Sequence, residues 1–555
     1  MSREVVAPQS LRRSGFRYGV AVQYASFDLE DPVFPALGLQ LSVQLVTLGN
    51  LYGLAADHVE VREGRGSFEM RAERLAWAGQ QEQAHGYVAL RVDRTPTGSL
   101  RAVVRAGAPE PVRCVKLLVR DLEAPLEVVA AEGARRAVGE HGELLSYPHT
   151  LPTPLLFIHS GGALLGLRAE DERVREKRFA VSVERTGPLA GRGVVELIHE
   201  EDASRFSTEL TTPPWLLTPD ASLAEVEREH LGFVERSHDL APWQERTDVP
   251  DWARRLRLVA TLHGMHFSGR IFLRYDEMLD VLRFLAQRLP GEHILAYLPG
   301  WEGRYYWQYG DYRPEPRLGG EKGFDALCEG ARRLGVHLMP MFGANCVNRW
   351  LPTMAGLDPS ANLKSATGNR FHGNQPDWDL ARSHDTGWQA WLNPGHPEWR
   401  ERLAADIVTL AERHGIDAVF LDTVHAWTND PDHPVTDGLR ALVKRLRSSI
   451  PGLLLAAEAD YDALLPLFPL FQRPWWTESP GWSSRYVRRF GHLCEGEPRG
   501  RTGVHEFGVY TSDAWSGGPG YLPTVAFQDG TLEAARAELE QRLAWLARAE
   551  TAGAL

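Results

Sequence analysis

Hydrophobic and polar residues alternate over short stretches in the first 220 residues of the chain. From Leu100 to Val104, apolar side chains occupy every second position, while Arg101 and Arg105 lie between or just beyond them. A period of two is typical of an antiparallel strand with one buried and one solvated face. Similar stretches, separated by turns rich in Gly, Pro or Asp, occur at residues 87–92, 112–119, 155–159 and 193–198. The pattern predicts a domain resembling a β-sandwich.

The hydrophobic pattern changes twice after this region. Residues 222–240 have Leu223, Val226, Leu231 and Val234 at helical spacing, and a proline-containing connector follows them. From residue 256 onward, short apolar runs alternate with amphipathic segments. The expected strands are residues 256–262, 293–298, 336–342, 416–421 and 453–457, with weaker candidates at 474–477, 504–509 and 524–527. The expected helices are residues 275–289, 324–334, 397–414, 437–449, 461–471 and 532–549.

Eight strands with interleaved helices indicate a (β/α)8 TIM barrel, and the structural alternative is an open, doubly wound sheet. A chain of 555 residues is also too long for a single hydrophobic core. We therefore predict a multidomain β plus α/β protein. Its expected parts are a β-sandwich domain over residues 1–220, a helical linker over 221–252 and a catalytic barrel over 253–555.

Composition narrows the class of protein. Hydrophobic residues make up 43% and charged residues 24%, as in ordinary globular proteins. The formal net charge of -12 leaves no basic stripe for nucleic acid, so we expect a neutral ligand. No signal-like or membrane-spanning apolar run is present, and we predict a cytoplasmic protein that does not bind a membrane. The alternative is a protein from which a leader peptide has been removed. The four cysteines lack C-x-x-C spacing, which favours buried free thiols. The oligomeric state stays open.

Two carboxylates stand at the ends of neighbouring predicted strands. Asp422 ends the apolar run that begins at Ile416, and Glu458 follows the run 453–457. Because parallel barrel strands end at the same rim, both side chains are expected at the barrel mouth, where TIM barrels hold their catalytic groups. Two carboxylates across a cleft can hydrolyse a glycosidic bond by acid and base catalysis, and a separation of about 5–5.5 Å suits a retaining mechanism.

The two carboxylates are expected to play different roles. Donors such as Thr423 or His425 would keep Asp422 ionised as the nucleophile. The alanines around Glu458 would raise its pKa and make it the acid/base. Alternatively, either residue serves as a helix cap or forms an ion pair at the rim.

Three segments around this pair resemble a known group of barrel glycoside hydrolases. They are Gly415-Ile-Asp-Ala-Val-Phe-Leu-Asp422, Trp391-Leu-Asn-Pro-Gly-His-Pro-Glu-Trp399 and Leu455-Ala-Ala-Glu458. They look like the corresponding parts of endo-α-N-acetylgalactosaminidases of glycoside hydrolase families 101 and 129. The resemblance implies an N-terminal β-sandwich, a retaining mechanism on an α-linked sugar of galactose or N-acetylgalactosamine type, Asp422 as nucleophile and Glu458 as acid/base.

Several residues near the predicted strand ends are candidates for binding the carbohydrate. His425 and Trp427 follow the proposed nucleophile, on a loop that must line a pocket. The other candidates, each of which packing or turn formation explains equally well, are Trp301, Glu302, Asn345, Trp476 and Glu478.

Two further functions remain as alternatives. His263 and His266, spaced by three residues just past a strand, would suit a metal-dependent amide or ester hydrolase. The last alternative is a carbohydrate-binding scaffold whose carboxylates lack a productive geometry. The leading hypothesis needs neither a cofactor nor a metal.

Overall fold

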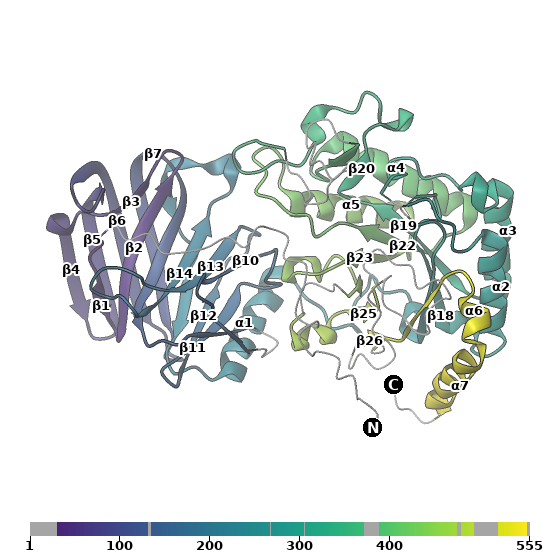
Figure 1. The fold of residues 1–555 in the computed structure, drawn as a ribbon, viewed down its shortest axis with the longest axis horizontal. Helices are drawn as coiled ribbons and strands as arrows, with labels where there is room; N and C mark the ends of the chain where they lie inside the picture. The colour runs from purple at the N-terminus through teal and green to yellow at the C-terminus, as the bar shows by residue number, and fades with distance from the viewer. Residues whose placement is uncertain are drawn as a thin grey trace, which may run out of the picture.

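The computed structural model describes residues 30–130, 135–266, 268–304, 306–370, 388–473, 479–492 and 520–551. These residues form a β domain and an α/β barrel that lie side by side (Figure 1). Cys114, Cys328 and Cys346 are buried free thiols, as expected, and Cys494 lies outside the described residues. None of the described helices has the length and apolar character that crossing a bilayer requires.

The β domain contains sixteen described strands that pair throughout in antiparallel fashion. The long strand β7 connects them: its first half pairs with β6, β15 and β16, and its second half pairs with β2 and β14. The expected sheet domain is therefore confirmed, but its strands join in one hydrogen-bonded network instead of two separate sheets. The strands are β1 (Phe34–Ala36), β2 (Leu39–Thr47), β3 (Leu51–Leu54), β4 (Val59–Gly64), β5 (Ser67–Trp77), β6 (Glu82–Arg94), β7 (Leu100–Leu122), β8 (Glu127–Val129), β9 (Arg135–Ala137), β10 (Glu143–Tyr147), β11 (Leu155–Ser160), β12 (Ala163–Ala169), β13 (Lys177–Val183), β14 (Gly193–Glu200), β15 (Ser207–Thr211) and β16 (Trp215–Thr218).

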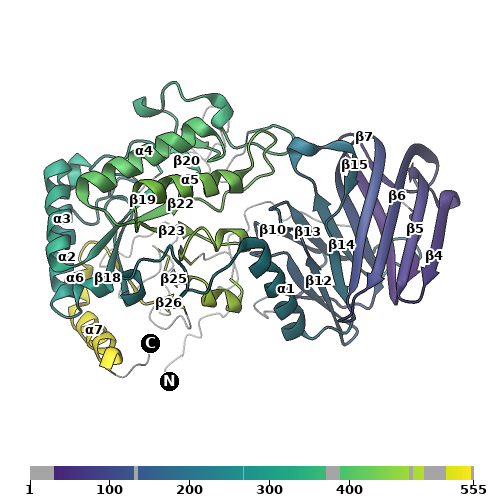
Figure 2. The same ribbon diagram turned by 180° about the vertical axis from the view of Figure 1, so that it is seen from behind.

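The expected linker helix is α1 (Leu223–His238), which lies at the junction of the two domains (Figure 2). It contacts β11 and β12 of the β domain and the short turn Asp462–Leu464 of the barrel. Val226, His230 and Val234 are buried at this junction. The apolar stripe of the helix thus holds the two domains together.

The second part of the chain is a barrel of parallel strands. The strand order is β17, β18, β19, β22, β23, β24, β25, and β26 and β27 follow as one strand interrupted at Pro523. Since β26 pairs with β25 and β27 pairs with β17, the parallel strands form a nearly closed ring, which is consistent with a barrel and unlike an open doubly wound sheet. The barrel strands are β17 (Leu258–Leu262), β18 (Ile294–Leu298), β19 (His337–Gly343), β22 (Ala418–Asp422), β23 (Leu454–Glu458), β24 (Leu470–Gln472), β25 (Arg488–Phe490), β26 (Tyr521–Leu522) and β27 (Thr524–Phe527).

Helices cover the outside of the barrel strands (Figure 1). They are α2 (Tyr275–Ala286), α3 (Gly320–Leu334), α4 (Pro397–His414), α5 (Val435–Ser449), α6 (Thr531–Ala534) and α7 (Arg536–Thr551), and a separate hairpin contains β20 (Cys346–Asn348) and β21 (Gln389–Trp391). The first five predicted barrel strands and their intervening helices are confirmed within a few residues.

The later barrel units differ from the prediction. Residues 461–471 were expected to be helical, but they form the turn Asp462–Leu464 and then begin β24. Pro466 explains the error, because proline lacks the amide proton that a helix needs and clashes with the preceding turn. The sixth and seventh strands are β24 and β25, and the segments 474–477 and 504–509 that were expected in their place both lie outside the described residues.

Candidate active site

Asp422 and Glu458 are the last residues of β22 and β23, which are adjacent and parallel. Both strands are buried along their whole length, and Leu421 pairs with Ala457 one position before the two carboxylates. This register brings the side chains to the same point of the C-terminal rim. This placement is consistent with the expectation from the sequence that the two carboxylates lie close together.

The two carboxyl groups lie within hydrogen-bonding distance of each other and are largely enclosed by protein. Asp422 is 4% exposed and Glu458 is 7% exposed. The Tyr309 hydroxyl donates to Asp422 Oδ2 at 2.5 Å, and the Thr423 amide donates to Glu458 Oε2 at 3.1 Å. Two acidic groups in direct contact share one proton, because both cannot carry a charge at this distance without a large electrostatic cost.

The surroundings of the two carboxyl groups change their pKa values in opposite directions. Burial, together with the negative charge of Glu458, raises the pKa of Asp422 well above its usual value. Burial alone would also raise the pKa of Glu458, but the adjacent His425 and the more distant His492 outweigh it and hold that pKa below its usual value. This arrangement is the reverse of the sequence-based expectation of an ionised Asp422 beside a protonated Glu458.

Two histidines surround Glu458. His425 Nδ1 lies 3.2 Å from Oε2, and His492 Nε2 lies 4.0 Å from Oε1. Burial lowers the pKa of His492 to about 4, although the charge of Glu458 opposes this shift. Thr423, which starts the loop that carries His425, has a left-handed φ of 64°, an unusual conformation for a β-branched residue. This turn directs its amide toward Glu458.

Trp301 and Glu302, at the end of β18, are both buried. Trp301 is 0% exposed, packs between Phe324 and Phe342, and donates from its indole to the Met341 carbonyl. This burial favours the packing role that the sequence left as the alternative for Trp301, and a role in binding the carbohydrate stays a prediction. Glu302 is 1% exposed, and burial raises its pKa to about 8. A role for Glu302 in binding substrate stays a prediction.

Asn345 and Trp427 both support the loop after β22. Asn345 is fully buried and donates from its side-chain amide to the Ala426 carbonyl. Trp427 is 4% exposed and makes an edge contact with His149 of the β domain, with ring centroids 5.8 Å apart. Trp476 and Glu478 lie outside the described residues.

His263 and His266 are buried beside Phe272, near the end of β17. Their ring centroids are 6.3 Å apart, and His266 contacts the Ser268 hydroxyl at 2.7 Å. Within the part of the chain that the structure describes, the only grouping of three potential metal ligands consists of Glu321, Asp325 and His414. Neither of these two histidines belongs to it.

The sequence analysis missed two residues of the carboxylate cluster. Tyr309 lies in the aromatic segment that follows β18, from which only Trp301 and Glu302 were named as candidates. His492 follows β25 by two residues, and it was overlooked because the seventh strand was expected further along the chain. A polar residue just past a correctly placed strand end is the signal that would have found His492.

Comparisons with known proteins complete the description of the site. A scan of protein-family models and a search of curated proteins gave no match. The fold is similar to that of the α-N-acetylgalactosaminidase NagBb from Bifidobacterium bifidum in complex with GalNAc, with 13% identity, a TM-score of 0.56, and coverage of 78% of this chain and 73% of that chain. The same enzyme in complex with Gal-NHAc-DNJ gives 16% identity, a TM-score of 0.57, and coverage of 79% and 74%.

A lower similarity is found to the family 36 α-galactosidase AgaA from Geobacillus stearothermophilus. Its TM-score is 0.49 at 13% identity, with coverage of 92% of this chain and 75% of that chain. At such identities, the likeness to NagBb shows a shared fold, in which a sheet domain accompanies a barrel.

Proposed function

We propose that the chain is a retaining glycoside hydrolase that cleaves an α-linked sugar of galactose or N-acetylgalactosamine type. The observation that carries this proposal is the pair Asp422 and Glu458, joined at the C-terminal rim of a closed barrel. The fold shared with an α-N-acetylgalactosaminidase supports the choice of sugar and of α configuration. The resemblance of the strand-end segments to families 101 and 129 points the same way.

In the proposed reaction, Asp422 attacks the anomeric carbon while Glu458 protonates the departing glycosidic oxygen. This forms a covalent glycosyl ester on Asp422 and releases the leaving group. Glu458 then takes a proton from water, and the resulting nucleophile displaces Asp422 from the sugar. The product keeps the configuration of the substrate.

The unliganded geometry adds one step to this sequence. The carboxyl groups are in direct contact, whereas retaining enzymes hold them about 5–5.5 Å apart, with the scissile bond between them. The incoming sugar must therefore separate the pair. As the pair separates, the shared proton passes from Asp422 to Glu458, and Asp422 takes on the negative charge, which the Tyr309 hydroxyl stabilises.

The first test is Asp422→Ala, assayed on aryl α-galactosides and α-N-acetylgalactosaminides. We expect kcat/KM to fall by several orders of magnitude, and azide to restore part of the turnover with an inverted product. Asp417→Ala is the matched control, because Asp417 precedes the same strand at the opposite end of the barrel, where it pairs with His337. Near-normal activity in a folded Asp422→Ala protein would refute the assignment.

The second test identifies the nucleophile directly. A slowly hydrolysed fluorosugar should label one carboxylate, and peptide mass spectrometry should find the sugar on Asp422. Labelling of Glu458 instead would make Glu458 the nucleophile and Asp422 the acid/base. These are the roles that match the raised pKa of Asp422 and the lowered pKa of Glu458 in the free protein. An absence of labelling, together with an inverted product, would replace the retaining mechanism with a single displacement.

A further inference from the structure

The β domain reaches the barrel mouth through the loop between β10 and β11. The Tyr147 hydroxyl donates to Asp462 Oδ1 at 2.6 Å, and the Thr153 hydroxyl donates to Asp462 Oδ2 at 2.8 Å. The Asp462 amide in turn donates to the Pro152 carbonyl at 2.8 Å. Both flanks of the loop are thus fixed to one buried aspartate of the barrel.

The loop is also ordered internally. The Ser146 carbonyl accepts hydrogen bonds from the amides of His149, Thr150 and Leu151, at 3.0, 2.7 and 3.0 Å. Such a turn holds the backbone of His149 in one position, and Tyr147 and Leu151 on either side of it are each 3% exposed. His149 itself remains exposed.

The side chain of His149 lies beside the loop after β22, which carries the histidine that contacts Glu458. It makes an edge contact with Trp427, and the Trp427 amide donates to the carbonyl of His425 at 2.7 Å. His425 is the residue that contacts Glu458. His149 is therefore linked to Glu458 through two intervening residues, Trp427 and His425.

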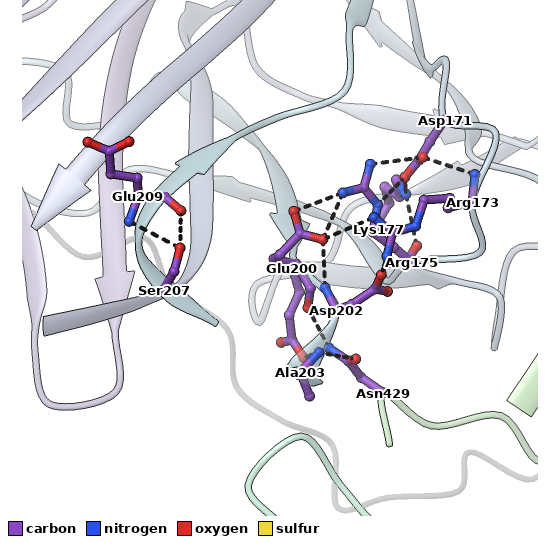
Figure 3. Close-up of polar contacts among 11 residues, drawn as sticks. Asp171, Arg173, Arg175, Lys177, Glu200, Asp202, Ala203, Ser207, Glu209 and Asn429 are labelled. Carbon is purple, nitrogen blue, oxygen red and sulfur yellow. Dashed lines mark hydrogen bonds and ion pairs between the residues drawn. The ribbon is translucent and has the colours of Figure 1, made fainter. Parts of the chain in front are cut away.

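A second contact holds the same loop against the β domain (Figure 3). The Asn429 side-chain amide donates to Glu200 Oε1 at 2.8 Å and to the Glu201 carbonyl at 2.7 Å, and its oxygen accepts from the Ala203 amide at 2.8 Å. Asn429 is 8% exposed. The loop that carries Trp427 is thus held against the β domain by two contacts, one at Trp427 and one at Asn429.

The chemistry of His149 suits a neutral ligand. A neutral imidazole offers one N–H donor and one acceptor nitrogen. Among the described residues, no side chain or backbone group is hydrogen-bonded to either ring nitrogen of His149.

We propose that the N-terminal β domain forms one wall of the substrate site, and that His149 hydrogen-bonds a hydroxyl or amide group of the bound carbohydrate beside Glu458. This inference rests on the proposed glycosidase function. It makes the β domain a direct contributor to substrate recognition and assigns a specificity residue outside the barrel.

The test compares His149→Phe with His149→Gln. Phenylalanine keeps a ring against Trp427 but cannot form hydrogen bonds, whereas glutamine keeps a donor and an acceptor. For the phenylalanine variant, we expect KM on an accepted α-glycoside, and the Kd for the free product sugar by calorimetry, to rise about tenfold with kcat little changed. The glutamine variant should recover part of the loss, with the melting temperature unchanged in both.

His58→Phe is the matched control, because His58 is an exposed histidine next to β4, at the end of the β domain far from the barrel (Figure 1). It should behave as the wild type does. Wild-type KM and Kd in His149→Phe, alongside an inactive Asp422→Ala, would overturn the role of His149 and leave the glycosidase function standing. A wild-type protein that neither hydrolyses nor binds an α-linked sugar would overturn both.

Discussion

Glu302 makes the stability of the protein depend on pH in a way that a single substitution can isolate. Its side chain is buried after β18, and neither carboxyl oxygen accepts a hydrogen bond from another described residue. Burial, with a smaller contribution from Glu315, raises the pKa of Glu302 from 4.5 to about 8. The folded protein therefore keeps a proton that the unfolded chain releases between these two values.

The sign of the effect follows from this proton. Because the folded-state pKa is raised, the contribution of Glu302 to stability is greatest below pH 4.5 and is lost as the pH rises to about 8. One pKa unit corresponds to about 1.4 kcal/mol, so the loss between pH 5.5 and 7.5 is about 3 kcal/mol. In Glu302→Gln, an uncharged amide of similar shape removes this titration.

Chemical denaturation of both proteins at several pH values measures the difference. The free energy of unfolding of Glu302→Gln minus that of the wild type should increase by about 3 kcal/mol from pH 5.5 to 7.5. Titration of the histidines and of the carboxylate pair is common to both proteins and cancels in this difference. A difference that stays constant across the pH range would refute the reasoning and show that Glu302 titrates in the folded protein near its ordinary pKa.

Three further outcomes are expected. Glu458→Gln should reduce kcat/KM far more for poor leaving groups than for nitrophenolate, and equal losses across a leaving-group series would contradict its role as the acid. Asn429→Ala should lower the free energy of unfolding by about 1–3 kcal/mol, because Glu200 and the Ala203 amide lose a buried partner. Denaturation curves that coincide with those of the wild type would show that this interdomain contact is dispensable. Prolonged chelation, and the double replacement of His263 and His266 by alanine, should each leave most of the activity, whereas loss to a chelator and recovery with zinc would favour a metal-dependent hydrolase.

The sequence predicted the barrel best where its strands are long and wholly apolar. The runs that end in Asp422 and Glu458 are five-residue buried strands, each preceded by a clear helix, so their pattern was unambiguous. By contrast, β24 and β25 have three residues each, and β25 contains two adjacent arginines. Strands this short carry no measurable periodicity, and only the closed ring of pairing reveals them.

The sequence predicted where the two carboxylates lie, but it did not predict which of them has the higher pKa. The two carboxylates were placed at one rim from strand ends alone. Which of them holds the proton depends on Tyr309, His425 and His492, which approach from three different loops. Electrostatic effects of this kind arise from contacts between distant segments, and local composition such as the alanines around Glu458 predicts them poorly.

Because its first and last strands pair with each other, the barrel can be completed only late in synthesis. Val259 of the first barrel strand pairs with Thr524 of the last, so an unpaired strand edge persists until β27 has left the ribosome. The β domain is complete long before that, since its strands end at Thr218. It is thus available to dock Asp462 and Asn429 as they emerge. We expect the nascent barrel to be the aggregation-prone intermediate of synthesis, with the finished β domain limiting the time for which its open edge is exposed.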